Sequence, residues 1–351
     1  MRIDPAFRTA ACISHGGNLG EAVRRYRIQR GQWIDLSTGI NPYGFPIPTI
    51  DPAMWLRLPD DDDGLEALAA RHYRANHALA VAGTQAAIRL LPALLPKGPV
   101  GIGLLTYGEY ARAFTQAGFP VEYFVTQSLT AYGYRAPFTL SAHAPLPGHL
   151  KHLIVVNPNN PTADLFDTDA LLDWRRQLLV RGGTLIVDEA FIDATPQYSI
   201  APASAAGHLI VLRSVGKFFG LAGARVGFVL SDRACIDAMR RLRGPWPLSG
   251  PARALARAAL LDSAWQRCAR DQLEAASARL SALLSANGLA AHRTPLFAWA
   301  FNARAAEVHD RLARNAVWVR CFEIVPSLRF GLPADETAWT KLASALSKSV
   351  I

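Results

Sequence analysis

The segment 153–187 begins with the apolar run LIVV at 153–156 and ends with a second run, TLIV, at 184–187, and the residues 168–180 between them have helical spacing. Short apolar runs are typical of strands that are buried on both faces, and the order strand, helix, strand predicts parallel pairing. The same alternation surrounds this segment, with strands expected at 100–105, 121–125, 209–212 and 226–230 and a helix at 109–117. The sequence therefore predicts an α/β fold with a mostly parallel sheet covered by helices.

The two ends of the chain have a different texture. Residues 1–45 are irregular and rich in glycine, and residues 62–96 have helical spacing. After about residue 246 there are long helical stretches rich in alanine and arginine, followed by strand candidates at 297–301, 317–320 and 328–331. Because a chain of 351 residues is too long for one small core, we expect a large domain over 46–245 and a smaller α+β domain formed by 1–45 and 246–351.

The composition excludes several classes of protein. Half of the residues (50%) are hydrophobic and 19% are charged, which is the balance of a globular protein. The formal net charge is +9, but no run of consecutive Lys or Arg indicates a nucleic-acid partner. The four cysteines lie far apart without the spacing of metal ligands, so we expect reduced thiols and no metal. Without an apolar stretch of membrane-spanning length or a signal peptide, we expect a cytoplasmic protein with no membrane partner.

Polar side chains follow three of the predicted strands at the point where each strand ends. Asn157–Asn160 follow the run at 153–156, Asp188 follows the run at 184–187, and Ser214–Lys217 follow the strand at 209–212. The carboxyl ends of parallel strands meet at one edge of a sheet, where ligands collect. We therefore expect the three segments to converge on one site.

Lys217 and Asp188 are the residues that indicate the chemistry of this site. Lys217 is flanked by small and apolar residues, and a desolvated lysine can react as a neutral amine with an aldehyde. A carboxylate at the end of an apolar strand, as at Asp188, can face a protonated ring nitrogen. A pyridoxal phosphate (PLP) enzyme needs both groups. Taken alone, a surface lysine in a glycine-rich loop and a helix-capping aspartate are the alternative interpretations.

A PLP enzyme also needs a cup for the cofactor phosphate. The hydroxyl of Ser214 and the guanidinium of Arg225 can grip a phosphate by charge-assisted hydrogen bonds. Gly83, Thr84 and Gln85 open a predicted helix whose free N–H groups can form a third wall.

Two further residues are candidates for contacts with the cofactor ring. Asn160 could donate a hydrogen bond to the ring hydroxyl, and Tyr107, which follows a predicted strand, could stack on the face of the ring. An Asn-Pro turn and a core tyrosine are the alternatives for these two residues.

These motifs resemble the fold-type I PLP enzymes of the aminotransferase class I and II superfamily over about residues 35–331. Within the branch of the histidinol-phosphate aminotransferases, the chain most resembles the threonine-phosphate decarboxylases of cobalamin biosynthesis. The sequences HGGN at 15–18 and DLSTGINP at 35–42 are similar to the N-terminal substrate loop of those decarboxylases. Phe191 and Leu58 stand where aminotransferases usually carry tyrosines, one on the ring hydroxyl and one on the phosphate of the neighbouring subunit's cofactor.

The resemblance also implies a substrate site. Arg329 matches the arginine that binds the substrate carboxylate, and Arg320 matches one that contacts substrate phosphate. The remaining substrate-binding candidates are Asn160 and five residues of the N-terminal loops, His15, Gly16, Gly17, Asn18 and Asn41. Ordinary surface arginines and a mobile N-terminal segment are the alternatives.

The implied fold is that of a PLP-dependent transferase with a large and a small domain, and the implied assembly is a homodimer. The implied activity is decarboxylation of a phosphorylated amino acid, L-threonine O-3-phosphate, to (R)-1-aminopropan-2-ol phosphate, with Lys217, Asp188 and Tyr107 as catalytic residues. The first alternative is a histidinol-phosphate or related aminotransferase. A second is a regulator or scaffold with this fold and no catalysis, against which the lysine, aspartate and arginine argue.

Overall fold

The computed structural model describes residues 16–349. His15, expected in the substrate loop, lies outside this range. The chain divides into two compact units. Within the described residues, the large unit comprises 45–160 and 164–265, and the small unit comprises 16–44, 161–163 and 266–349. Residues 246–265 thus belong with the large unit.

The large unit is built on an eight-stranded sheet with the order β2-β9-β8-β7-β6-β3-β4-β5. Six neighbouring strands, from β8 to β5, are parallel, and β9 runs antiparallel to both β8 and β2. This sheet confirms the predicted α/β class. The strands are β2 (Ala78–Val81), β3 (Val100–Gly103), β4 (Val121–Thr126), β5 (Phe138–Leu140), β6 (His152–Val156), β7 (Thr184–Asp188), β8 (Leu209–Ser214) and β9 (Gly227–Leu230).

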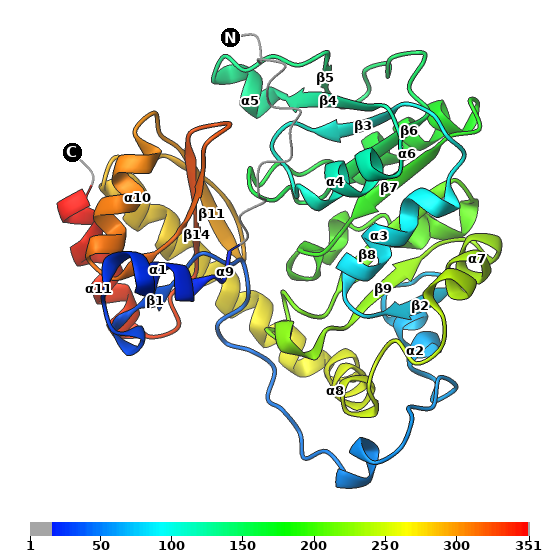
Figure 1. Ribbon diagram of the computed structural model, residues 1–351, viewed down its shortest axis with the longest axis horizontal. Helices are drawn as coiled ribbons and strands as arrows, with labels where there is room; N and C mark the ends of the chain where they lie inside the picture. The colour runs from blue at the N-terminus through cyan, green and yellow to red at the C-terminus, as the bar shows by residue number, and fades with distance from the viewer. Residues whose placement is uncertain (1–15, 350–351) are drawn as a thin grey trace. The chain divides into compact units, whose positions relative to one another are not determined.

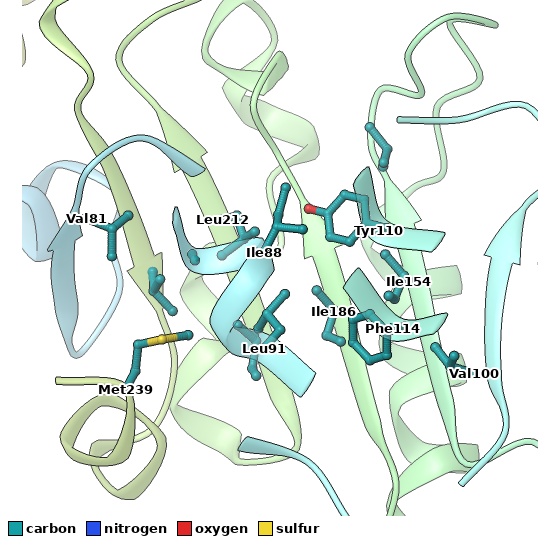
Figure 2. Close-up of a cluster of buried hydrophobic side chains, with 14 of the residues drawn as sticks. Val81, Ile88, Leu91, Val100, Tyr110, Phe114, Ile154, Ile186, Leu212 and Met239 are labelled. Carbon is teal, nitrogen blue, oxygen red and sulfur yellow. The ribbon is translucent and has the colours of Figure 1, made fainter. Parts of the chain in front are cut away.

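Helices pack on both faces of this sheet (Figure 1). On one face α3, α4 and α7 share a buried apolar cluster with the sheet, in which Ile88, Leu91 and Phe114 contact the strands around Ile186 (Figure 2). On the other face α6 packs against β7. The helices of the large unit are α2 (Leu65–His72), α3 (Thr84–Leu94), α4 (Glu109–Gln116), α5 (Gln127–Ala131), α6 (Thr168–Leu179), α7 (Arg233–Arg243) and α8 (Gly250–Leu261).

One part of the helical prediction over residues 62–96 is wrong. The helices α2 and α3 lie within this range, but strand β2 separates them. The four residues of β2, ALAV, are all buried and pair with β9. A short apolar run between two amphipathic helices has no polar position to set its period, so its sequence does not distinguish helix from strand.

The small unit contains a four-stranded antiparallel sheet with the order β10-β11-β14-β13. A parallel pair, β1 with β12, attaches the N-terminal segment to this unit. The strands are β1 (Ile34–Asp35), β10 (Ala291–Thr294), β11 (Phe297–Phe301), β12 (Val317–Trp318), β13 (Arg320–Phe322) and β14 (Ser327–Gly331). The helices are α1 (Leu19–Tyr26), α9 (Ser263–Ala286), which begins in the large unit, α10 (Ala305–Arg314) and α11 (Glu336–Ser349).

Within residues 16–349, none of the helices has the length and apolar character that crossing a membrane requires. Within the same range, no group of three or more His, Cys, Asp or Glu side chains could hold a metal ion.

Candidate active site

The register of three strands brings the predicted phosphate cup together. Gly227, the first residue of β9, lies opposite Ser214 on β8 and opposite Val81 on β2. A Cβ atom on Gly227 would lie 2.8 Å from the backbone nitrogen of Thr84, so only glycine leaves room for the start of α3 here. The end of β8 and the start of α3 are therefore held on either side of one glycine.

The side chain of Arg225 packs against Gly83, the residue that precedes α3. Gly83 has a positive φ of +73°, and a Cβ atom there would lie 2.6 Å from Nη2 of Arg225. The exposed guanidinium thus packs directly over a glycine, next to the free N–H groups at the beginning of a helix. Ser214 is buried at the end of β8, and its Oγ accepts a hydrogen bond of 3.2 Å from the Gly216 N–H. This cation, hydroxyl and helix start form a cradle for an anion such as a phosphate.

Asp188 ends β7 as a buried carboxylate. Its Oδ1 accepts a 3.0 Å hydrogen bond from the Ala190 N–H, and its Oδ2 accepts a 2.7 Å bond from the Tyr110 hydroxyl. Burial raises the pKa of Asp188, whereas the Tyr110 hydroxyl, the Ala190 N–H and the charge of Lys217 act to lower it. Asp188 is therefore an oriented acceptor within the electrostatic reach of Lys217.

Lys217 follows β8 in a turn and is half-buried. Its Nζ lies 5.6 Å from the centre of the Phe191 ring, and Phe191 follows Asp188 by a few residues. The amine and the carboxylate that the sequence predicts as partners are thus placed at neighbouring strand ends, because β7 and β8 are adjacent and parallel.

Tyr107 and Gln85 are joined by hydrogen bonds. The Tyr107 hydroxyl donates to Oε1 of Gln85 over 3.0 Å, and Nε2 of Gln85 donates to the buried carboxylate of Glu109. Burial, followed by the charges of Glu109 and Asp188, raises the pKa of Tyr107 to about 12. Tyr107 is therefore a neutral phenol in a fixed position.

The Asn-Pro segment after β6 links three strand ends. The Asn157 N–H donates to the Asp188 carbonyl over 2.8 Å, and Asn159 Nδ2 donates to the Leu105 carbonyl over 2.9 Å. Asn160 is half-buried at the end of this segment. The convergence of these strand ends agrees with the sequence; the role of Asn160 stays a prediction.

A second group of predicted residues lies in the small unit. Arg320 on β13 and Arg329 on β14 are opposite each other in the antiparallel register. Arg329 is buried, and its Nη2 donates to the Ser37 carbonyl over 2.6 Å. Burial, with a smaller effect of the Arg320 charge, lowers the pKa of Arg329 to about 9. Two guanidinium groups on one sheet therefore form a strongly positive environment.

The N-terminal loop contacts Arg329, one of these two arginines. Gly16 packs against the Ser37 carbonyl, with Arg329 Nη2 just beyond, and the Gly17 N–H donates to Ser37 Oγ over 2.8 Å. Two other predicted residues have local partners. Asn18 Nδ2 donates to Glu21 over 3.2 Å, and Asn41 Oδ1 accepts from the Tyr43 N–H over 2.8 Å. The structure thus brings Gly16 and Gly17 to the Arg329 environment, and the substrate-binding roles of Asn18 and Asn41 stay predictions.

Three residues that hold these sites, and one buried structural residue, were not predicted from the sequence. Tyr110, Glu109 and Ser37 carried no signal, because only the packing of α4 and of the N-terminal loop gives them their partners. For Arg213, by contrast, the sequence did contain a signal. A charge within the apolar strand β8 requires a buried partner, and Arg213 Nη1 contacts Glu189 at 2.8 Å while its Nη2 contacts Asp193.

The residues of the large unit fit PLP. The cradle at Gly83, which a Cβ would fill, offers a cation and helix N–H groups for a phosphate. Asp188 offers an oriented anionic acceptor for a ring N–H, and Lys217 offers an amine at the next strand end. This donor set matches the three requirements of that cofactor.

Comparison with known proteins agrees with this geometry. The model of the family "Aminotransferase class I and II" matches residues 59–346. A threonine-phosphate decarboxylase from Pseudomonas aeruginosa is 47% identical over 335 residues, which cover 95% of this chain and 97% of that protein. One from Sinorhizobium sp is 40% identical over 347 residues, covering 97% and 99%. A histidinol-phosphate aminotransferase from Shewanella oneidensis is 36% identical over 157 residues, covering only 44% and 38%.

Solved structures share the fold at lower sequence identity. The histidinol-phosphate aminotransferase from Sinorhizobium meliloti in complex with pyridoxal-5'-phosphate superposes with a TM-score of 0.78 at 19% identity, covering 99% of this chain and 97% of that chain. The L-threonine-O-3-phosphate decarboxylase from Porphyromonas gingivalis gives 0.69 at 17% identity, covering 89% and 98%. On the evidence of the sequence match and the fold together, the chain belongs to the aminotransferase class I and II family.

Proposed function

We propose that this chain is a PLP-dependent decarboxylase that converts L-threonine O-3-phosphate to (R)-1-aminopropan-2-ol phosphate. The likeness to threonine-phosphate decarboxylases along nearly the whole chain carries this choice, because the likeness to a histidinol-phosphate aminotransferase covers less than half of it. We expect the product to serve cobalamin biosynthesis, as the resemblance of the N-terminal loops implies.

The large unit provides the groups that would hold the cofactor. Ser214, Arg225 and the N–H groups after Gly83 would bind its phosphate, Tyr107 would lie against its ring, and Asn160 would donate to its ring hydroxyl. Asp188, as an anion, would keep a proton on the ring nitrogen. Bound PLP supplies an electron-withdrawing ring that weakens one bond at the Cα atom of an attached amino acid. Lys217 Nζ is the group that we expect to return a proton to Cα.

The small unit provides the groups that would bind the substrate. Arg320 and Arg329 lie directly opposite each other in the antiparallel register, and two neighbouring guanidinium groups can bind anions through charge-assisted hydrogen bonds. O-phosphothreonine carries both a carboxylate and a phosphate, which suit two guanidinium forks. The anchoring of these two anions would orient the Cα atom of the substrate and so select which of its bonds is broken. We expect the bond between Cα and the carboxylate to be the one that is broken, because the substrate loop resembles that of the decarboxylases.

A homodimer is also part of the proposal. The segment 47–58, which includes the short helix Pro52–Trp55, carries four large apolar side chains that are 64% to 88% exposed: Ile47, Trp55, Leu56 and Leu58. Several large apolar groups exposed on one segment are typical of a surface that a second copy covers. We further infer a cytoplasmic location, with which the free thiols of Cys235, Cys268 and Cys321 are consistent.

The test is an assay of the PLP-loaded protein with O-phosphothreonine and without any 2-oxo acid. We expect release of carbon dioxide and stoichiometric formation of the phosphorylated amino alcohol. Turnover of histidinol phosphate that requires a 2-oxo acid acceptor, with no carbon dioxide from O-phosphothreonine, would establish the aminotransferase instead. Analytical ultracentrifugation of the same sample tests the dimer.

A further inference from the structure

Tyr110 connects the hydrophobic core of the large unit to the carboxylate of Asp188. The residue lies in the first turn of α4 and is fully buried. Its ring packs in the apolar cluster with Phe114, Ile154 and Ile186, and its hydroxyl oxygen is the polar end of the side chain (Figure 2). That hydroxyl donates to Asp188 Oδ2 over 2.7 Å. Because the surrounding core holds the ring, the hydroxyl has a fixed position.

This hydrogen bond sets the orientation of the carboxylate. Asp188 Oδ2 accepts from Tyr110 and Oδ1 accepts from the Ala190 N–H, so each oxygen has a donor. Two donors on different oxygens fix the plane of a carboxylate, which still has lone pairs for a further donor. The direction in which Asp188 presents those lone pairs therefore depends on α4.

Tyr110 also contacts Tyr107. The ring centres are 6.4 Å apart and the planes meet at 80°, an edge-to-face arrangement that is favourable for aromatic pairs. The other end of Tyr107 is held by Gln85. Tyr110 thus touches both the residue expected at the ring nitrogen and the residue expected on the ring face.

We propose that Tyr110 is a positioning residue of the cofactor site, which holds Asp188 as an oriented anion through its hydroxyl and supports Tyr107 through its ring. This inference rests on the proposed function, because it concerns the site for PLP. It assigns a role to a side chain outside the set that would contact the cofactor.

The charges around Asp188 determine the expected pH dependence. The groups that face its carboxylate are the Tyr110 and Tyr107 phenols from α4 and its preceding loop and the Lys217 amine after β8. Burial and the negative charge of Asp188 raise the pKa of Tyr110, so the phenol remains a donor. Donation to a carboxylate lowers its pKa, so loss of this hydroxyl raises the pKa of Asp188. If PLP binding requires anionic Asp188, lowering the pH then weakens PLP binding sooner, at a higher pH than in the unmodified protein.

The decisive variant is Tyr110→Phe in the full chain, which removes one oxygen and keeps the ring. We expect the dissociation constant for PLP, measured by titration of the apoprotein, to rise about tenfold at neutral pH, as for the loss of a hydrogen bond to a charged group. The acid limb of a plot of PLP affinity against pH should move to higher pH. In the Asp188→Asn background, the same substitution should have little further effect.

Tyr26→Phe is the matched control. Tyr26 donates to Asp310 Oδ1 over 3.0 Å in the small unit, so the control removes the same kind of bond from a pair outside the cofactor site. It should leave PLP affinity and its pH profile unchanged.

The outcomes separate this inference from the proposed function. Absence of PLP binding by the unmodified protein would overturn the function itself. Normal binding by the unmodified protein, with an unchanged affinity and pH profile in Tyr110→Phe, would overturn only the role of Tyr110.

If Tyr110→Phe does not fold, 3-fluorotyrosine can replace tyrosine throughout the chain in the Tyr107→Phe background. The more acidic phenol should move the acid limb to lower pH, and an unmoved limb would contradict the inference.

Discussion

Arg213 of the large unit and Arg329 of the small unit are both buried arginines on sheet strands, but different groups surround them. Arg213 contacts the carboxylates of Glu189 and Asp193 and lies 4.2 Å from the Tyr73 ring centre. Arg329 donates to a backbone carbonyl and lies across the sheet from another arginine.

The pKa values of the two arginines shift in opposite directions. Burial acts to lower the pKa of Arg213, but Asp193 and Glu189 outweigh it and raise that pKa. Burial and the charge of Arg320 lower the pKa of Arg329 to about 9. The charge of Arg213 is compensated within the fold by two carboxylates, whereas a guanidinium opposite a like charge is suited to a ligand anion. Burial of an arginine by itself therefore does not distinguish a structural role from a binding role.

The largest expected effect is on stability, at Arg213. Arg213→Met leaves Glu189 and Asp193 buried without their guanidinium partner, and breaking a buried ion pair in this way costs about 3–5 kcal/mol. Urea unfolding of the full chain measures the loss. The control Arg233→Met removes an exposed pair with Asp237 and should cost less than about 1 kcal/mol. Equal losses in the two variants would show that the buried triad has no special structural weight.

Arg329→Met should impair activity strongly and stability only slightly, the opposite of what we expect for Arg213→Met. We expect kcat/KM for O-phosphothreonine to fall about 100-fold, as for the loss of charge-assisted hydrogen bonds, while the free energy of unfolding falls far less than in Arg213→Met. Arg329→Lys should recover little activity, because an ammonium lacks the planar fork. The comparison fails if Arg329→Met unfolds as readily as Arg213→Met.

A third arginine, Arg225, is exposed, unlike Arg213 and Arg329. It tests whether the position of a guanidinium, without burial, is enough for ligand binding. Gly83→Ala would push a Cβ into its guanidinium, and we expect PLP to bind about tenfold more weakly, equivalent to about 1.4 kcal/mol. Gly207→Ala is the control, because Gly207 has nearly the same backbone angles as Gly83 (φ 69° and ψ 161° against φ 73° and ψ 159°), and a Cβ added there meets only Asp232 Oδ2, at an ordinary 3.8 Å. Both variants share the backbone strain, and weaker PLP binding by both would make strain the cause.

The smallest expected effect is stabilisation of the apoprotein by inorganic phosphate. An anion near Arg320 and Arg329 offsets their like charges, and at a few times its dissociation constant it should add about 1 kcal/mol. Thermal unfolding should then shift upward by about 2 °C, and not at all with sodium chloride of equal ionic strength. Arg329→Met should reduce the shift and leave only the part due to phosphate in the cradle at Gly83 and Arg225; an undiminished shift in that variant would place the whole effect elsewhere.

The fold could be predicted from the sequence where the residues of a segment fit only one kind of environment. The runs at 153–156 and 185–187 are apolar throughout, and both lie in buried strands. The polar residues after them could be assigned to one edge, because parallel strands end on the same side. Strand β2 was missed, because ALAV fits a buried helix as well as a buried strand.

The candidate reacting groups could be named from the sequence, because a lysine, an aspartate and a glycine-led helix start are the residue types that PLP requires. Their arrangement was a property of the tertiary structure. The register around Gly227 joins the segments of the proposed phosphate cradle. The packing of α4 gives Asp188 its second donor, and the partners of Arg213 and Arg329 distinguish a structural arginine from one that we expect to bind substrate. Hydrogen bonds and charges act over a few ångströms, and which groups come that close is decided only when distant segments pack together.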